Sequence, residues 1–332
     1  MTLWLHGLGH AHPENEITNR FLEELDIGTT DAWILERVGI RSRRTALSLD
    51  YIRETRNADV RGALEASQWS TAGLGARAGE LAIERAGIER SDVGMLLFGS
   101  CAPDFVTPAD GCNAAAELGL EVPALDVNSA CTSLLAHVHL LSLMDPAKLP
   151  DYVLVVVSDT LTKTVDYSDR SAAVLWGDGA AAAVFSTRVP GRARVLGSQL
   201  ASRPAGAGKV VVPRSGYFAQ EGRTVQAFAI RQTGLCYDAL RDEFAQPERP
   251  FHFVGHQANL RMLENVCRRS EIPADRHHSN VEWFGNTGAP GSGSVASMQW
   301  EKWSNHDDVA LVGVGAGLTW SSALLRFEED PA

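Results

Sequence analysis

The stretch ALDVNSACTSLL (Ala124–Leu135) places a cysteine where two elements meet. An apolar, strand-like run precedes a bend of small polar residues, and a helical pattern rich in leucine follows it. Cys131 therefore stands at or near the first residue of a helix, where free N–H groups and the helix dipole favour a thiolate. A buried structural cysteine is the alternative, and this stretch alone does not decide between the two.

Short apolar runs alternate with amphipathic helical patterns along the chain, which predicts an α/β protein with mixed or parallel sheets. The strongest strand patterns are VGMLLFGS (93–100), YVLVVVSD (152–159), FHFVGH (251–256) and VALVGVGAG (309–317). A long helix is expected around Gln226–Phe244, after a connection rich in Gly, Pro and Ser that we expect on the surface (201–223). Each half pairs two strands across a turn of small residues, which is a weak sign of duplication.

Composition excludes several classes of protein. The chain of 332 residues is 45% hydrophobic and carries a net charge of −11, which argues against a nucleic-acid binder. It contains no CxxC pair, and the cysteine spacings fit no zinc site, so no metal is predicted. The N-terminus has no signal-peptide pattern, and no apolar run reaches the ~20 residues that span a bilayer. We expect a cytoplasmic protein that does not enter a membrane.

Two further polar residues follow strand or loop signals that suit an active site. His256 comes directly after the apolar strand pattern FHFVG, and strand ends are where α/β folds collect functional groups. Asn286 lies in the glycine-rich loop WFGNTGAPGSGS, where the backbone can approach a ligand closely. Each has an ordinary alternative, a packed histidine and a turn asparagine.

Together these stretches resemble the ketoacyl synthase III group of the thiolase-like condensing enzymes. The resemblance covers nearly the whole chain, in register, through six blocks: TTDAWILERVGIRSR, ACTSL, SDTLTKTVDYSDRSAAVLWGDGAAAAV, GHQANLR, GNTG and GVGAGLTWSSALLRF. It implies two similar halves, each a mixed sheet with helices, layered αβαβα. Residues 1–190 would carry the cysteine, and residues 191–332 the histidine and asparagine.

The resemblance also implies roles for the matched residues. Cys131 would carry an acyl chain as a thioester, and His256 and Asn286 would stabilise the enolate of a second thioester. The backbone N–H groups of Cys131 and Ala316 would form the oxyanion hole. The chemistry needs no cofactor beyond acyl-coenzyme A or acyl carrier protein thioesters. No second thiol occupies the GVGAG loop, unlike in degradative thiolases, and an asparagine stands where elongating synthases have a second histidine.

Two groups of residues match binding surfaces of this family. Trp33, Arg37 and Arg170 correspond to the residues around the coenzyme A nucleotide, with core packing of the tryptophan as the alternative. A set of arginines after the histidine motif would receive the acidic acyl carrier protein, unless it is a solvated helix face: Arg261, Arg268 and Arg269. The family also predicts a homodimer.

Three departures predict a specialised member of the group. Thr107 replaces the bulky residue that commonly closes the partner's acyl pocket, the segment Ala46–Gly73 is long enough for an extra helix over the entrance, and Ser321 follows Trp320 in place of glycine. These changes favour a substrate larger than acetyl and a role in polyketide or specialised fatty-acid biosynthesis. Two alternatives remain open: joining two β-ketoacyl chains without decarboxylation to give an α-pyrone, and acyl transfer to an alcohol or amine.

Overall fold

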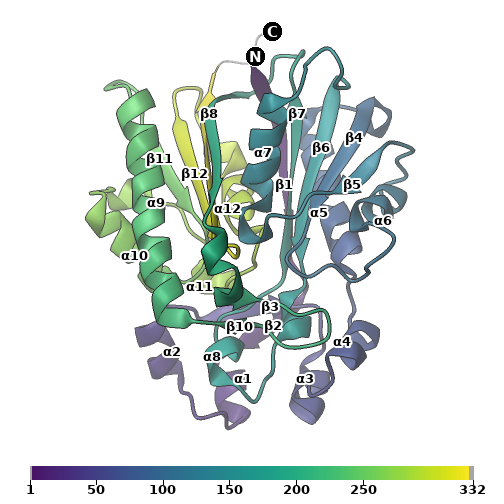
Figure 1. Cartoon of the computed structure of the whole chain (residues 1–332), viewed down its shortest axis with the longest axis vertical. Coiled ribbons are helices and arrows are strands. Elements are labelled where there is room, and N and C mark those ends of the chain that lie inside the picture. The colour runs from purple at the N-terminus through teal and green to yellow at the C-terminus, as the bar shows by residue number, and fades with distance from the viewer. Residues whose placement is uncertain (1, 329–332) are drawn as a thin grey trace.

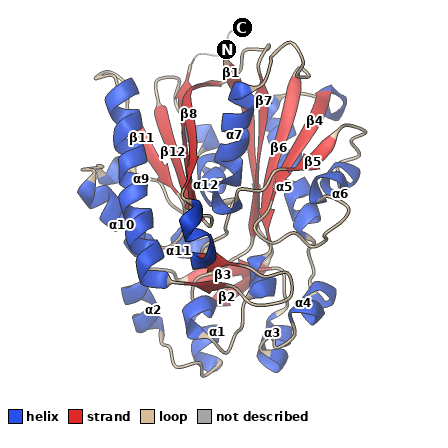
Figure 2. Ribbon diagram, viewed as in Figure 1, coloured by secondary structure: helices blue, strands red, loops and turns tan. Residues whose placement is uncertain are grey.

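The computed structural model, described here for residues 2–328, is built on one nine-stranded mixed sheet (Figures 1 and 2). The strand order is β11-β12-β13-β8-β1-β7-β6-β4-β5. The strands are β1 (Leu3–Ala11), β4 (Val93–Gly99), β5 (Ala124–Asp126), β6 (Tyr152–Asp159), β7 (Gly179–Ser186), β8 (Ala193–Ser202), β11 (Phe251–Gly255), β12 (Asp308–Gly315) and β13 (Thr319–Phe327). Two small sheets pair β2 (Asn15–Thr18) with β3 (Ser42–Thr45) and β9 (Val210–Val211) with β10 (Ala219–Gln220).

The helices complete a unit that occurs twice along the chain. They are α1 (Asn19–Glu24), α2 (Asp31–Arg37), α3 (Leu49–Thr55), α4 (Val60–Ala66), α5 (Thr71–Ala86), α6 (Asp110–Glu117), α7 (Ser133–Leu143), α8 (Arg170–Ala173), α9 (Gly222–Phe244), α10 (Leu260–Arg269), α11 (Val281–Phe284) and α12 (Gly291–Met298). The order β1-α5-β4-α6-α7-β6-β7 in the first half matches β8-α9-β11-α10-α12-β12-β13 in the second.

Strand directions repeat as well. In the first half β4 and β6 are parallel and β6, β7 and β1 are successively antiparallel; β11, β12, β13 and β8 follow the same pattern. Antiparallel pairing of β1 with β8 joins the two sets of strands. The predicted fold class, with two similar mixed-sheet halves, is therefore confirmed. The boundary between residues 190 and 191 stays a prediction, and the start of β8 at Ala193 supports it.

Alternation of apolar residues arranges the two halves in five layers. In β6 the side chains of Val153, Val155 and Val157 face one core cluster, while Leu154 and Val156 face another. The cluster that contains Val153, Val155 and Val157 also includes residues of strands from both halves and of α7 and α12. These two helices lie between the two sets of strands (Figure 1). Helices α5 and α6 cover the outer face of the first half, and α9 and α10 that of the second. Because α7 is apolar on nearly every side, it suits this central position.

A smaller layer of short elements lies below the sheet in Figure 2, where α1 to α4, α8, β2 and β3 gather around their own apolar cluster. The segment Ala46–Gly73 forms two short helices here, α3 and α4. The sequence predicted an extra helix over the entrance. Instead, α4 packs on the 3₁₀ turn Leu161–Thr164, and its residues Val60, Arg61 and Leu64 line a second cavity described below.

The connection between β8 and α9 lies largely on the surface, as predicted, but part of it turns inward. Phe218 is buried at 8% exposure, and Phe218 and Val210 line the cavity that also contains Cys131. The helix after it begins at Gly222 rather than near Gln226. Apolar residues inside a Gly- and Pro-rich segment thus serve as a cover for the cavity. Within residues 2–328, no helix combines the length and apolar character needed to cross a membrane.

Candidate active site

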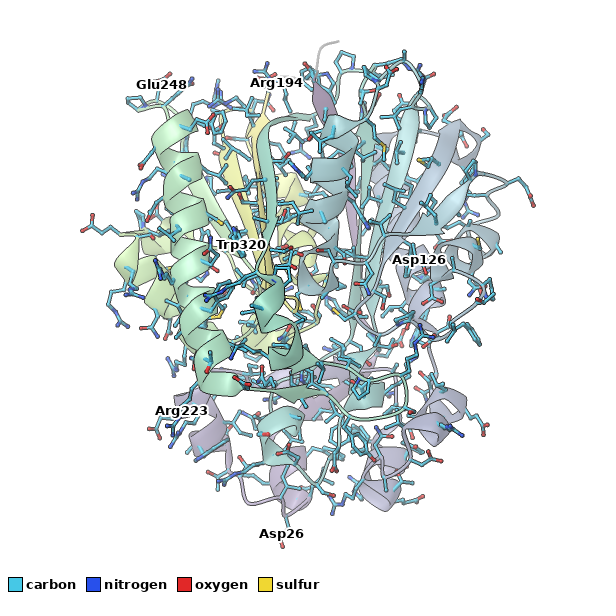
Figure 3. The ribbon with its side chains drawn as sticks, viewed as in Figure 1. Asp26, Asp126, Arg194, Arg223, Glu248 and Trp320 are labelled. Carbon is cyan, nitrogen blue, oxygen red and sulfur yellow. The ribbon has the colours of Figure 1, made fainter. Side chains whose placement is uncertain are left out.

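A cavity of about 210 Å³ brings together the residues that the sequence singled out. Its lining includes Cys131 from the first half and His256, Asn286 and Ala316 from the second. An apolar group under α9 forms one wall, with Ala229, Met262 and Val314 at its centre and Trp320 beside it. Figure 3 labels Trp320 next to α9, where its ring meets that of Phe228 edge to face. The cavity is therefore an apolar chamber with a few convergent polar groups.

Side-chain hydrogen bonds fix the turn that presents Cys131. The residue lies in a 3₁₀ turn (Ala130–Thr132) directly before α7. The Ser133 hydroxyl donates to the Ala130 carbonyl over 2.7 Å, and the Ala130 N–H donates to Asn128 Oδ1 over 2.7 Å. Ala130 has a φ of +48°, a conformation that costs a non-glycine residue about 1–3 kcal/mol. The small polar residues before the helix thus hold the thiol at a strained turn.

The surroundings of Cys131 favour its thiolate. Its Sγ lies 4.0 Å from the Sγ of Cys101, and His256 is its other polar neighbour. The pKa of Cys131 is held well below its usual value, first by the hydrogen bond from Cys101 and then, against the cost of burial, by the charge and hydrogen bond of His256. The pKa of Cys101 is raised, first by its hydrogen bond to Cys131 and then by burial and the Asp159 carboxyl nearby. We therefore assign the negative charge to Cys131.

Asn286 is oriented as a hydrogen-bond donor. Its Oδ1 accepts a hydrogen bond from the Gly288 N–H over 3.0 Å, which leaves the Nδ2 group to donate. Its backbone is fixed as well, because the Asn286 N–H donates to the Leu175 carbonyl over 2.8 Å. His256 follows β11 and is 6% exposed, so its ring is shielded except at the cavity. A histidine and an amide donor thus line the wall shared with the Cys131 thiol.

The loop between β12 and β13 approaches Cys131 closely. Ala316 lines the cavity, and Gly315 packs against the backbone of Cys131. A Cβ added to Gly315 would lie 3.1 Å from both the backbone N and the Cβ of Cys131, so a side chain there would crowd the nucleophile. This contact places the backbone of the loop next to the N–H of Cys131, as an oxyanion hole requires.

Asp159, at the end of β6, ties the two halves together behind the thiol. It is fully buried, and burial raises its pKa to about 7. One carboxylate oxygen accepts from the Cys101 N–H over 2.6 Å, and the other accepts from the Ala289 N–H over 2.7 Å. At Gly288 a Cβ would collide with the Asp159 carboxylate. The loop that carries Cys101 and the loop that carries Asn286 are therefore held by one side chain.

Trp33, Arg37 and Arg170 form one group on the surface near the cavity. The guanidinium carbon of Arg170 lies 4.8 Å from the centre of the Trp33 ring, and that of Arg37 lies 5.6 Å from it. Arg37 itself also lines the cavity. Trp33 is half-buried and packs in part against the apolar cluster of the lower layer, as its core-packing alternative expected, while both arginines are exposed beside its ring. An aromatic face with two cations suits a nucleotide carrying phosphates.

The three arginines of α10 divide into two kinds. Arg261 is half-buried, pairs with Glu264 at 2.9 Å and donates to the Leu35 carbonyl over 2.8 Å, so it braces α10 against α2. Arg268 and Arg269 are exposed at the end of the helix. The charges of these last two are the more open to solvent, whereas that of Arg261 is engaged by Glu264 and Leu35. Thr107 is also exposed, in the loop after β4, and is not among the described residues that line the cavity of its own chain.

A second cavity of about 370 Å³ was not predicted from the sequence. Cys101 lines it, together with residues of α4 and of the loop after β4. A nearly buried ion pair between Lys163 and Asp104 also belongs to its wall, with side chains 5% and 8% exposed. Cys101 thus stands between the two cavities. The pattern GSC directly after a strand was its only sequence signal, and it lacks the histidine or helix start that marks a reactive thiol.

Among residues 2–328, no three His, Cys, Asp or Glu side chains are grouped so that they could hold a metal ion.

The five layers, with a thiol on one half facing a histidine and an asparagine on the other, define a thiolase-like condensing enzyme. Comparison with known proteins agrees. The family model for the 3-oxoacyl-[acyl-carrier-protein (ACP)] synthase III C terminal matches residues 244–327, and that for 3-oxoacyl-[acyl-carrier-protein (ACP)] synthase III matches residues 125–204.

Full-length relatives extend the match. The beta-ketoacyl-[acyl-carrier-protein] synthase III of Chlamydia pneumoniae is 32% identical, over 96% of this chain and 95% of its own. The crystal structure of the synthase III of Pseudomonas aeruginosa PAO1 superposes with a TM-score of 0.84 at 30% identity, covering all of both chains. The crystal structure of the priming beta-ketosynthase from the R1128 polyketide biosynthetic pathway superposes with a TM-score of 0.79 at 26% identity, covering 99% of this chain and 97% of that one. This chain belongs to the beta-ketoacyl-ACP synthase III family of acyl-transferring condensing enzymes.

Proposed function

We propose that this protein loads an acyl chain onto Cys131 and condenses it with a malonyl or β-ketoacyl thioester, in polyketide or specialised fatty-acid biosynthesis. The observation that carries the proposal is the single cavity lined by Cys131, His256 and Asn286. The resemblance to a priming ketosynthase of a polyketide pathway supports the choice of pathway class.

Acylation begins at the Cys131 thiolate, which attacks the carbonyl carbon of an acyl thioester. The carbonyl oxygen becomes an oxyanion, and the N–H groups of Cys131 and Ala316 are the proposed donors to it. The tetrahedral intermediate collapses with loss of the coenzyme A or carrier thiolate, which leaves the acyl group on Cys131. Because the reactive species is the thiolate, acylation slows when the pH falls below the lowered pKa of Cys131.

Condensation then uses the donors of the second half. His256 and the Nδ2 group of Asn286 hydrogen-bond the thioester carbonyl of the malonyl group, whose carboxylate leaves as carbon dioxide. The electron pair of the broken bond becomes an enolate, which these donors stabilise. Its carbon attacks the acyl carbonyl, the C–S bond breaks, and Cys131 returns as the thiolate. No cofactor is needed beyond the two thioesters.

The residues exposed around the cavity suggest which molecules supply the acyl groups. Trp33, Arg37 and Arg170 would hold the nucleotide of coenzyme A, and Arg268 and Arg269 would contact an acidic acyl carrier protein. A homodimer, with Thr107 reaching the acyl pocket of its partner, and a cytoplasmic location remain predictions. The exposed position of Thr107 is compatible with a contact to a second copy.

A second candidate reaction joins two β-ketoacyl thioesters without decarboxylation, on the way to an α-pyrone. It requires a base for the α-proton, and His256 is the imidazole in contact with Cys131 at the cavity wall. Acyl transfer to an alcohol or amine has less support, because it uses neither of the enolate-stabilising donors that this cavity contains.

Stoichiometry of carbon dioxide release tests the proposal. Wild-type enzyme and C131A are given a panel of acyl-coenzyme A donors with either malonyl or β-ketoacyl thioesters, and carbon dioxide and products are quantified. We expect one carbon dioxide per condensed product, and no condensed product with C131A. Product without carbon dioxide would favour the second candidate, and an ester or amide without a new carbon–carbon bond would overturn the proposal.

A further inference from the structure

Cys101 stands out because it is a thiol next to the proposed nucleophile that the reaction just described does not use. It follows the end of β4 by two residues, and its Sγ lies 4.0 Å from the Sγ of Cys131, within the range of a hydrogen bond between sulfur atoms. Cys131 lines the active-site cavity and Cys101 lines the second cavity, whereas three cysteines line neither of them: Cys112, Cys236 and Cys267.

The backbone around Cys101 is fixed by Asp159. The Cys101 N–H and the Ser100 hydroxyl both donate to Asp159 Oδ1, over 2.6 and 2.9 Å, and the Ala102 N–H donates to Ser100 Oγ over 3.1 Å. Three consecutive residues are therefore held in one conformation. This arrangement orients the Cys101 side chain toward Cys131 before any substrate binds.

The charges around the two thiols decide which of them carries the proton. The pKa of Cys101 is raised first by its hydrogen bond to Cys131, then by burial, and then by the nearby Asp159 carboxyl, so the proton stays on Cys101. Cys131 has the His256 ring and the N–H groups of the α7 turn nearby. The pair is thus polarised, with an S–H group on Cys101 and a thiolate on Cys131.

We propose that Cys101 is a positioning residue whose thiol donates a hydrogen bond to the Cys131 thiolate. The inference rests on the proposed role of Cys131 as nucleophile and adds a donor from the first half of the fold. The bond is strongest when Cys131 is a thiolate, before acylation and again when the C–S bond breaks in condensation. It weakens in the acyl-enzyme, because a thioester sulfur is a poor acceptor. Cys101 therefore favours the two states in which sulfur carries the charge.

The test compares C101A, which removes the donor, with C101S, which keeps a hydroxyl donor at the same site. Alkylation of Cys131 by iodoacetamide is followed across pH, with peptide-resolved mass spectrometry to separate it from the other thiols. We expect the pKa of Cys131 to rise by about one unit in C101A. At a pH below both pKa values, alkylation should then slow roughly tenfold. C101S should stay within about threefold of the wild type, as should the exposed control C112A.

Alkylation needs no acyl substrate, so its outcome is independent of whether the proposed condensation is correct. If C101A does not fold, C101V fills the space of the thiol without a donor and is compared with C101S instead. An unchanged pH profile in the variant without a donor would overturn the proposal. Equal shifts in C101S and in the variant without a donor would overturn it too, because they would show that the volume of the side chain matters and its hydrogen bond does not.

Discussion

The ends of β4 and β11 occupy the same place in the two repeated halves, yet they carry different chemistry. Two residues after β4 comes Cys101, and one residue after β11 comes His256. Both side chains are neighbours of Cys131, which lies at the start of α7 between them. The equivalent strand ends of the two halves thus place a neutral thiol and an imidazole next to the same sulfur. The comparison teaches that duplication supplies equivalent positions, while the residue at each position decides its role.

The largest expected effect separates these two strand ends. Because His256 and Asn286 are proposed to stabilise the enolate, H256A and N286A should each lower the condensation rate by about 10²–10³-fold, more than C101A. H256A should also slow acylation, since His256 lowers the pKa of Cys131. N286A should acylate within about threefold of the wild type. Separate measurement of acyl-enzyme formation by mass and of product by chromatography checks this; slow acylation in N286A would contradict the division of roles.

The next effect concerns the residue that joins the halves. In the wild type, one Asp159 oxygen accepts from the Cys101 N–H and the other from the Ala289 N–H. In D159N one of these oxygens becomes an NH₂ group, which cannot accept, so one of the two backbone N–H groups loses its partner. A buried N–H without a partner costs about 1–3 kcal/mol, so the free energy of unfolding should fall by that amount. Denaturant titration measures it, with D145N on the surface as control. Unchanged stability would show that the tie between the halves is weak.

The same carboxyl gives a pH dependence. Its pKa is about 7 in the folded protein and near 4 when unfolded, so the folded state binds the proton more tightly. Its contribution to stability is full below pH 4 and is lost as the pH rises through 7. Between pH 4 and pH 7 the wild type should therefore lose stability relative to D159N, which has no titrating carboxyl at this position. Parallel stability curves for the two proteins over that range would contradict it.

A smaller effect is expected in the layer of short elements below the sheet, which belongs to neither of the two repeated units. W33A removes the ring that faces Arg37 and Arg170. A cation–π or stacking contact of this kind contributes about 1 kcal/mol, so KM for an acyl-coenzyme A donor should rise about fivefold with little change in kcat. W283A, which removes another exposed tryptophan near an arginine, is the matched control. Equal effects of the two would show that Trp33 does not contact the donor.

The smallest effect tests a further contrast between equivalent elements. Helix α6 follows β4 and carries acidic residues, whereas α10 follows β11 and ends in Arg268 and Arg269. Charge reversal in R268E/R269E should weaken the reaction with an acyl carrier protein substrate several-fold at low salt and less at high salt. Reaction with acyl-coenzyme A should be unchanged. A loss with both donors would instead indicate damage to the fold.

Much of this arrangement could be predicted because it is local in the sequence. A strand followed by small residues and a helix is enough to place Cys131 at a helix start, and FHFVG is enough to place His256 at a strand end. Cys101 could not be predicted in the same way, because its contact with Cys131 depends on how two loops 30 residues apart meet across β4 and α7. Phe218 was missed for a related reason: its segment has the composition of a surface loop, and only packing over the cavity buries it.

The central claim is that the one sulfur at the start of α7 carries the acyl chain. Its most direct measurement is the intact mass of the protein, followed by peptide mapping, after a short incubation with an acyl-coenzyme A and no second substrate. We predict a mass increase of one acyl group on the peptide containing Cys131, sensitive to hydroxylamine, absent in C131A and retained in C101A. An acyl group on another residue, or no adduct in an enzyme that still forms product, would contradict the account.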